Sequence, residues 1–345
     1  KIRVLSFSEN NNDSIYNFSK NIVIESVSVN NNYFVKYISG KLKVLVYLYK
    51  LYFKFKKHNI EFINCHNLSS LIIGVLLKKG SAKTLIYDPH ELETEKQNLS
   101  KLTRLLSKPL EKYLIKYVDQ LITVCDPISE WYRHTYDLKI PVYTIRNIPE
   151  LKKCDTNKMI DLKRNYSIKN DDVLFIYQGI LSSHRGIDIL LKVFSKVNRD
   201  KHIIFMGYGD FETEIKKYSN NFYNIHFKEA VAPSEIISYT SSCDIGIHFN
   251  HSNVSLSYSF SLPNKFFEYL SAGIPLLVSN SYEYMSNLIC KYGLGYSISS
   301  EIDTLINSIN QINYNEIKTF KKNINKYTNE NHWNKEKEIY KNIYT

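Results

Sequence analysis

The sequence contains few cysteines, and none of them stands in a pattern that indicates a disulfide or a metal site. Its five cysteines are dispersed over 345 residues without a CxxC pair, which is typical of reduced thiols. The apolar runs are short and interrupted by lysines, so none predicts a membrane-spanning helix. The start, Lys1–Phe7, lacks the cleavage pattern of a secretion signal. We therefore expect a cytoplasmic protein.

Several enzyme signatures are also absent. There is no P-loop and no GxSxG motif, which argues against a P-loop NTPase and a serine hydrolase. Gly207 and Gly209 begin a dinucleotide fingerprint, but Glu212 occupies the position of its third glycine, so a turn is the better interpretation. His248 and His251 have neither the helical context nor the acidic partner of a zinc protease site. We expect no metal site.

The composition combines ordinary globular content with an excess of positive charge. Hydrophobic residues make up 43% and charged residues 23%, and the length suits two domains. Lys and Arg total 45 against 34 acidic residues, a net charge of +11, which favours nucleic acid, an acidic membrane surface or a phosphorylated substrate as partner. Nucleic acid is disfavoured because the aromatic residues occupy core-like positions and no RNP or helix-turn-helix signature is present.

Short apolar runs alternate with segments of helical periodicity along almost the whole chain. The predicted strands are Ile2–Phe7, Glu61–Cys65, Thr84–Tyr87, Gln120–Val124, Val173–Tyr177, Ile203–Met206, Asn224–Phe227, Asp244–His248 and Ile274–Val278. The alternation is typical of βαβ units, so we predict an α/β protein with two Rossmann-like, doubly wound parallel-sheet domains. Ligands of such sheets bind outside the carboxyl ends of the strands, which puts the expected site in a cleft between the domains.

The Pro-flanked stretch Pro141–Pro149 interrupts this rhythm, and a polar linker is expected at 150–158. We place the first domain at residues 1–150 and the second at 151–318. A C-terminal helical segment, 319–345, is expected to pack back across both. The chain begins at Lys1 rather than at a methionine, which leaves room for a further N-terminal piece.

Two basic, aromatic segments have helical periodicity, Lys41–Lys57 and Lys101–Tyr117. Such helices lie on an anionic membrane surface or are buried with their lysine ends reaching the solvent, and the sequence leaves both interpretations open.

The first candidate motif, Tyr87–Glu91, follows a predicted strand directly. At that position His90 would project into the cleft, where an imidazole can bind a phosphate or a hydroxyl or transfer a proton. Alternatively, Asp88 or Glu91 caps the following segment and His90 lies in a turn.

The second motif, Gly179–Gly186, joins a predicted strand to a helix. A glycine-containing turn of this kind exposes backbone N–H groups to an anion, and Arg185 adds a charge with a geometry suited to phosphate. A tight loop with a solvent-facing arginine explains the pattern equally well.

The third motif, Ser261–Pro275, predicts a helix from about 264 to 272, with Pro263 near its start and Gly273 past its end. Lys265 and Glu268 lie on one face at i, i+3 spacing. They form either a surface ion pair or a binding pair, in which the cation holds a pyrophosphate and the carboxylate accepts two ribose hydroxyls.

Taken in order, these motifs resemble the family 4 glycosyltransferases, which are retaining nucleotide-sugar enzymes of the GT-B fold. Tyr87–Glu95 is similar to the D-x-H-E segment of bacterial capsule and lipopolysaccharide transferases. Arg146–Pro149 resembles the turn that ends the first domain, and Gly179–Gly186 resembles the G-R-L…K-G loop. Leu262–Glu268 is similar to the nucleotide-binding helix.

The resemblance implies a hexosyl-type transferase that moves a sugar from a UDP- or GDP-linked donor to a polysaccharide or lipid-linked acceptor in surface-glycan synthesis. It implies action without a metal or other cofactor, in the cytoplasm or at a peripheral position on the inner face of the cell membrane. His90 would be the catalytic residue. The residues implied to bind the donor are Gly179, Arg185, Glu229, Pro263, Asn264, Lys265 and Glu268. Among these, Arg185 and Lys265 would neutralise the pyrophosphate, Glu268 would hold the ribose and Glu229 would border the base.

The sequence departs from the family pattern at three places. Phe260 stands eight residues before Glu268, where the family has a second glutamate that holds sugar hydroxyls. Ile180 replaces an arginine, and no glycine-rich loop is found near Phe7–Asn12. Two other functions therefore stay open: a GT-B nucleotide-sugar epimerase or hydrolase, and a non-catalytic nucleotide- or carbohydrate-binding subunit of a glycan assembly complex.

Overall fold

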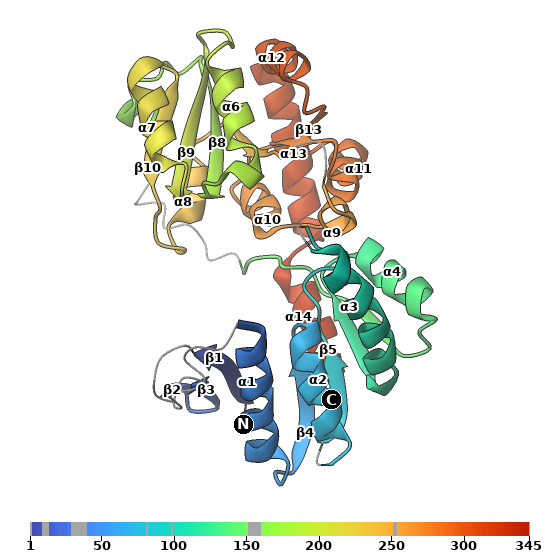
Figure 1. The fold of residues 1–345 in the computed structure, drawn as a ribbon. Helices are drawn as coiled ribbons and strands as arrows, with labels where there is room; N and C mark the ends of the chain where they lie inside the picture. Colours follow the sequence, from blue (N-terminus) through green and yellow to red (C-terminus); the bar gives the residue numbers. More distant parts are fainter. Residues whose placement is uncertain are drawn as a thin grey trace. The chain divides into compact units, whose positions relative to one another are not determined.

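The computed structural model describes residues 2–8, 14–28, 40–80, 82–97, 99–150, 160–250 and 254–344 (Figure 1). The chain divides into two compact units. The first comprises Lys1–Thr94, Ser100–Ile122 and Tyr132–Tyr143, and the second comprises Glu95–Leu99, Thr123–Trp131 and Thr144–Thr345. The predicted domain limits stay predictions, and the expected linker falls almost wholly on residues 151–159, outside the described ranges.

The first unit contains two small sheets and the helices beside them. One sheet has the order β1-β3-β2 and the other the order β4-β5-β6-β7. The strands are β1 (Ile2–Ser8), β2 (Ser14–Ser19), β3 (Ile22–Ser28), β4 (Ile60–Cys65), β5 (Ala82–Tyr87), β6 (Gln120–Thr123) and β7 (Val142–Thr144). The helices are α1 (Gly40–Phe55), α2 (Leu68–Lys78), α3 (Lys101–Leu114), the 3₁₀ turn η2 (Ile115–Tyr117) and α4 (Asp126–Tyr136), of which β6, β7 and α4 continue into the second unit.

The three-stranded sheet differs from the prediction. The expected first strand does form β1, but it pairs in parallel with β3 instead of joining β4 and β5. β2 and β3, which the sequence analysis did not identify, form an antiparallel pair joined by a two-residue turn at Lys20–Asn21. β4, β5 and β6 are parallel neighbours, as predicted for this part of the chain.

The second unit is built on one six-stranded sheet whose strand pairs are all parallel, in the order β10-β9-β8-β11-β12-β13 (Figure 1). Its strands are β8 (Val173–Ile180), β9 (Lys201–Tyr208), β10 (Ile225–Glu229), β11 (Ile245–His248), β12 (Leu276–Ser279) and β13 (Gly295–Ile298). Its helical segments are α5 (Leu162–Asn165), η4 (Ser183–Arg185), α6 (Ile187–Phe194), α7 (Glu212–Asn221), α8 (Ile236–Thr240), α9 (Leu256–Phe260), α10 (Asn264–Ser271), α11 (Glu283–Tyr292), α12 (Ile302–Gln311), α13 (Tyr314–Glu330) and α14 (Trp333–Ile343).

Helices cover both faces of this sheet. Alternate strand residues such as Phe175, Phe205 and Ile247 form a buried cluster with apolar side chains of α6, α7 and α12. On the opposite face, Gly246 lies against Tyr269 of α10, since a Cβ at Gly246 would lie 2.4 Å from the ring. A parallel sheet covered on both faces is the arrangement that the alternating sequence pattern predicted for this half of the chain.

The paired glycines after β9 have a packing role. A Cβ at Gly207 would lie 1.8 Å from the carbonyl oxygen of Gly179, and one at Gly209 would lie 2.3 Å from that of Leu181. These glycines therefore allow the ends of β8 and β9 to approach closely, in agreement with the turn interpretation. Among the described residues, no helix combines the length and the apolar character needed to cross a bilayer.

Candidate functional site

A polar pocket of about 240 Å³ lies at the carboxyl ends of the central strands of the second unit. This is the edge of a parallel sheet at which ligands are expected. Strands β8 and β11, the loop around η4 and the start of α10 supply most of its walls. The lining residues are Tyr177, Ile180, Ser182, Arg185, His248, Phe249, Asn250, Tyr258, Lys265 and Tyr282.

Lys265 is the buried cation of this pocket. It is the second residue of α10 and only 8% exposed, and its Nζ lies 4.2 Å from the centre of the Tyr177 ring. A Cβ at Gly179 would lie 3.7 Å from the same Nζ, so the predicted glycine and lysine are neighbours. Burial lowers the pKa of Lys265 to about 7, helped by the charge of Arg185 and opposed by that of Glu268. A bound anion would restore the charged form.

Arg185 supplies a second positive charge to the same pocket. It ends the short turn η4, and the next residue, Gly186, is held at φ +69 with its Cβ position 3.1 Å from the backbone of Asn250. Only glycine fits this conformation without strain, which fixes the loop that carries Arg185. Two cations in one partly enclosed pocket favour a ligand with two negative charges, such as a diphosphate.

Glu268 is oriented by a hydrogen-bond chain from the sheet. Gln178 Nε2 donates to Glu268 Oε2 at 2.5 Å, and the Gln178 Oε1 accepts a hydrogen bond from Thr240 Oγ1 at 2.6 Å. The carboxylate lies one turn from Lys265 on α10 and is half-buried. It does not line the pocket, but it is held in place with oxygen lone pairs left to accept hydroxyls.

The other predicted donor residues have simpler positions. Pro263 precedes the first residue of α10 in an extended conformation, and Asn264 begins the helix with an exposed side chain. Glu229 ends β10, is exposed, and does not line the pocket. Their roles stay predictions.

Of the residues that line this pocket, sequence reasoning assigned only Arg185 and Lys265 to the site, and it missed His248, Tyr258 and Tyr282 among others. His248 is 6% exposed, and its ring centre lies 4.4 Å from that of Tyr282. The available signal was the position of His248 at the end of a buried apolar strand, where a polar residue points to the ligand edge.

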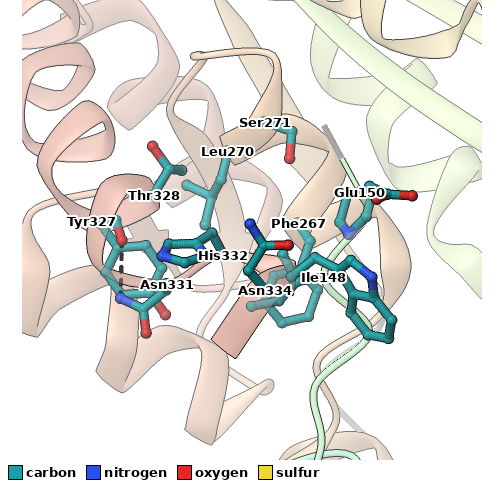
Figure 2. Close-up of a pocket in the computed structure, with 12 residues that line it drawn as sticks. Ile148, Glu150, Phe267, Leu270, Ser271, Tyr327, Thr328, Asn331, His332 and Asn334 are labelled. Carbon is teal, nitrogen blue, oxygen red and sulfur yellow. Dashed lines mark hydrogen bonds between the residues drawn. The ribbon is translucent and has the colours of Figure 1, made fainter. Parts of the chain in front are cut away.

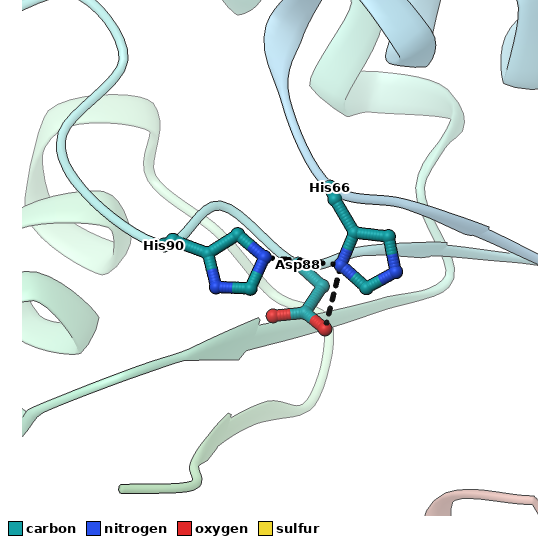
Figure 3. A group of neighbouring side chains, drawn as sticks. All are labelled: His66, Asp88 and His90. Carbon is teal, nitrogen blue, oxygen red and sulfur yellow. Dashed lines mark hydrogen bonds and ion pairs between the residues drawn. The ribbon is translucent and has the colours of Figure 1, made fainter. Parts of the chain in front are cut away.

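His90 belongs to the first unit, where it forms a cluster with His66 and Asp88 (Figure 3). The ends of β4 and β5 bring these residues together, because Cys65 pairs with Tyr87 in the parallel register. His66 Nδ1 lies 3.3 Å from Asp88 Oδ2 and 3.2 Å from His90 Nε2. The hydrogen bond to Asp88 raises the pKa of His66. Asp88, which is buried, therefore orients His66, and His66 in turn contacts the exposed His90.

The same cluster is a set of potential metal ligands. One ligand atom from each of His66, Asp88 and His90 lies within 4.8 Å of the others. Two imidazole nitrogens and a carboxylate oxygen suit zinc and similar divalent ions. The sequence analysis did not anticipate this arrangement, because His66 belongs to none of its motifs.

A second pocket, of about 270 Å³, lies on another side of α10 (Figure 2). Phe267, Leu270 and Ser271 face it from α10, and the junction of α13 and α14 closes it with Tyr327, Asn331 and His332. None of the predicted site residues lines this pocket.

Comparison with protein families decides the class of the protein. The family model described as glycosyl transferases group 1 matches residues 159–331, which is half of the chain. This range contains every residue that lines the pocket of Arg185 and Lys265, which is called the cation pocket below. The chain belongs to the glycosyl transferases group 1 family. It is accordingly a glycosyltransferase, and the enzyme class predicted from the sequence is confirmed. A search of curated protein sequences gave no significant match.

Solved structures agree on the fold. The chain is similar to sucrose-phosphate synthase from Thermosynechococcus elongatus, with a TM-score of 0.70 and 14% identity over 99% of this chain and 88% of the other. The chain is also similar to HepE from Anabaena in complex with UDP, with a TM-score of 0.67 and 14% identity over 93% of this chain and 85% of the other. For the lipopolysaccharide outer core galactosyltransferase WaaB, the TM-score is 0.52 and the identity is 14%, over 89% of this chain and 85% of the other. The predicted α/β GT-B fold with parallel sheets is confirmed.

Proposed function

We propose that this glycosyltransferase moves a sugar from a UDP- or GDP-linked donor to a polysaccharide or lipid-linked acceptor in bacterial surface-glycan synthesis. The observation that carries the proposal is the pair of cations, Arg185 and Lys265, in a pocket at the ligand edge of the parallel sheet. When the bond between the sugar and the diphosphate breaks, negative charge develops on the leaving nucleotide diphosphate. The two side chains stabilise that charge in a partly enclosed pocket.

Glu268 completes the donor site in this proposal. Its carboxylate, held by Gln178, accepts hydrogen bonds from the ribose hydroxyls while the cations hold the diphosphate. Similar structures support the choice of donor, since HepE was solved with UDP and with UDP and glucose. WaaB, a lipopolysaccharide transferase by name, supports the surface-glycan role.

His90 acts at the sugar in this proposal, with transfer that retains the anomeric configuration and uses no metal. We expect His90→Ala to lower kcat by about a hundredfold, because a positioned acid–base group contributes on that scale, and to change KM by less. Donor hydrolysis and transfer assays with His90→Ala check this. An excess of EDTA in the same assay should leave the wild-type rate unchanged. A rate that falls with EDTA and returns with zinc would instead make His66, Asp88 and His90 a metal site.

The outer face of α3 supports action at the inner face of the cell membrane. Leu102, Leu105 and Leu106 are 66%, 69% and 63% exposed, and Tyr113 continues the same stripe two turns further on. Basic residues follow one flank of the stripe, at positions Lys101, Arg104, Lys108 and Lys112. The acidic residue of this helix, Glu111, is fully buried, and its carboxylate accepts hydrogen bonds from three tyrosines. An apolar stripe beside cations, with its acid turned inward, matches an anionic lipid surface.

A thermal-shift series with UDP, GDP, ADP and CMP, and with their common sugars, tests the donor assignment. Ligand at 100 times its dissociation constant stabilises the folded protein by about 2.7 kcal/mol, which is readily measured. We expect a clear shift with UDP or GDP and their sugars. Assay of the products with and without a glycan acceptor then separates a transferase from an epimerase or hydrolase. No shift with any nucleotide would overturn the proposal.

A further inference from the structure

His248 is a buried polar side chain at the wall of the cation pocket. It ends β11, in the middle of the six-stranded sheet, and is 6% exposed. Within the part of the chain that the structure describes, neither Nδ1 nor Nε2 has a hydrogen-bond partner. Burying an imidazole without partners costs free energy, so a site of this kind is retained where a ligand supplies the missing hydrogen bond.

The surroundings of His248 limit what that ligand group is. The pocket places the imidazole with Arg185 and Lys265, and aromatic side chains, Tyr177 and Tyr282 among them, form its apolar walls. In the proposed function the cations hold the diphosphate. In the donor the diphosphate joins the ribose of the nucleoside to the sugar. Glu268, which holds the ribose in the proposed function, does not line this pocket, so the sugar is the neighbour that the rest of the pocket receives.

The charge state of His248 favours a hydroxyl over a phosphate oxygen. Burial, reinforced by the nearby charges of Lys265 and Arg185, holds the pKa of His248 well below its usual value, so the ring is neutral at physiological pH. A neutral imidazole has one donor and one acceptor nitrogen. A sugar hydroxyl also donates and accepts, whereas a phosphate oxygen accepts only and already has two cations available.

We propose that His248 binds a hydroxyl of the donor sugar and, with the tyrosines beside it, forms the sugar subsite of this glycosyltransferase. This inference rests on the proposed function. It also accounts for the sequence, in which Phe260 occupies the position where a glutamate would hold sugar hydroxyls. The Tyr282 ring lies against the imidazole, with the two ring centres 4.4 Å apart, so it forms the wall beside this subsite.

Two affinities measured on the same variants test the proposal. Titration calorimetry gives the dissociation constants of UDP and UDP-glucose, and of GDP and GDP-mannose, for the wild type, His248→Phe and His248→Gln. Phenylalanine fills the space without nitrogens, and glutamine keeps a donor and an acceptor. We expect His248→Phe to weaken binding of the nucleotide sugar about tenfold, as for a lost buried hydrogen bond, and to change binding of the free nucleotide less than twofold. His248→Gln should recover part of the loss.

Each other outcome has a definite meaning. If His248→Phe weakens the free nucleotide and the nucleotide sugar equally, the imidazole contacts the phosphates and the sugar subsite is wrong. Unchanged affinity for both would show that His248 only packs the wall, which overturns the proposal as well. If the wild type binds neither nucleotide, the proposed function itself fails. Circular dichroism and thermal unfolding confirm that the variants are folded, and His248→Gln keeps the test decisive if His248→Phe does not fold.

Discussion

At the scale of single residues, Lys265 makes donor binding depend on pH near neutrality. Its pKa of about 7 means that the free pocket loses a charge as the pH rises from 6.5 to 8.5. A bound diphosphate favours the charged lysine, so binding above pH 7 requires proton uptake and the affinity falls as the pH rises. We expect the dissociation constant of the nucleotide sugar to increase by roughly tenfold or more over this interval. Titration calorimetry at four pH values measures it.

Lys265→Arg is the matched control, because a guanidinium stays charged throughout this range. The variant should bind with little dependence on pH. A pH dependence equal to that of the wild type would show that another group takes up the proton. The nucleotide sugar is the suitable probe, since its diphosphate has no terminal phosphate that titrates here.

Glu268 gives a second prediction at this scale. If its carboxylate holds the ribose, Glu268→Ala removes charge-assisted hydrogen bonds worth about 1.5–3 kcal/mol each, and the affinity for the nucleotide falls at least tenfold. Asp303→Ala, at the exposed start of α12, makes the same change of net charge away from α10. Calorimetry with UDP and GDP compares the two variants. Nucleotide affinity that Glu268→Ala leaves at the wild-type value would exclude the ribose role.

At the scale of elements, α3 is the segment expected to bind lipid. Leu105→Ser with Leu106→Ser should lower binding to phosphatidylglycerol vesicles at least tenfold, because each leucine loses about 1.5–3 kcal/mol of apolar burial. Neutralising the four basic residues on the flank of α3 should also lower vesicle binding, by about fivefold for each charge removed. Vesicle co-sedimentation measures both, with neutral phosphatidylcholine vesicles as a reference. These leucines are exposed, so their replacement removes little packing, and circular dichroism checks that the variants are folded.

A matched variant separates the role of α3 from net charge alone. Lys318, Lys322, Lys335 and Lys337 are exposed on α13 and α14, and replacing all four by glutamine lowers the charge by the same amount. This variant should still bind the vesicles. If replacing the four lysines of α13 and α14 lowers vesicle binding as much as neutralising the basic residues of α3, then net charge alone explains the effect of the α3 cations. If light scattering instead shows a dimer that only the leucine variant dissociates, the stripe is an interface between two copies of the chain.

Helices and strands in which the apolar residues follow a clear pattern could be predicted from the sequence, and those with a mixed pattern could not. Five of the six strands of the second sheet were found because buried parallel strands such as Ile203–Met206 are continuous apolar runs between clear helical segments. The sixth, β13 (Gly295–Ile298), was missed because it is short and mixes glycine and serine with its apolar residues. β2 and β3 were missed because Ser14–Ser19 and Ile22–Ser28 mix polar and apolar residues and their turn lacks glycine. In the site, Arg185 and Lys265 were identifiable from motifs after strands. His66 was not, because only the register of β4 and β5 brings it to Asp88 and His90. His248 ends a predicted strand, and that position was not used to assign it to the site.

At the scale of the whole molecule, an ion pair whose carboxylate is buried ties the C-terminal helix to the middle of the chain. Arg146 Nη2 lies 2.6 Å from Glu336 Oε1, and Glu336 Oε2 also accepts from the backbone N–H of Arg146 at 2.9 Å. Glu336 is 1% exposed and the Arg146 side chain is partly exposed, so removing the carboxylate leaves a partly buried guanidinium without its charged partner. The contact joins residues 190 positions apart within the second unit, and it holds α14 in place.

We expect Glu336→Ala to lower the free energy of unfolding by about 3 kcal/mol, as for breaking one side of a buried pair. Urea unfolding followed by circular dichroism measures it. Glu338→Ala on the same helix is the control, because its pair with Lys341 is exposed and contributes at most about 0.5 kcal/mol. Equal effects of the two variants would show that α14 contributes only its helical propensity. A large effect confined to Glu336 would show that the fold of the donor-binding unit depends on this helix, since the pair is its buried polar link to the turn at Arg146.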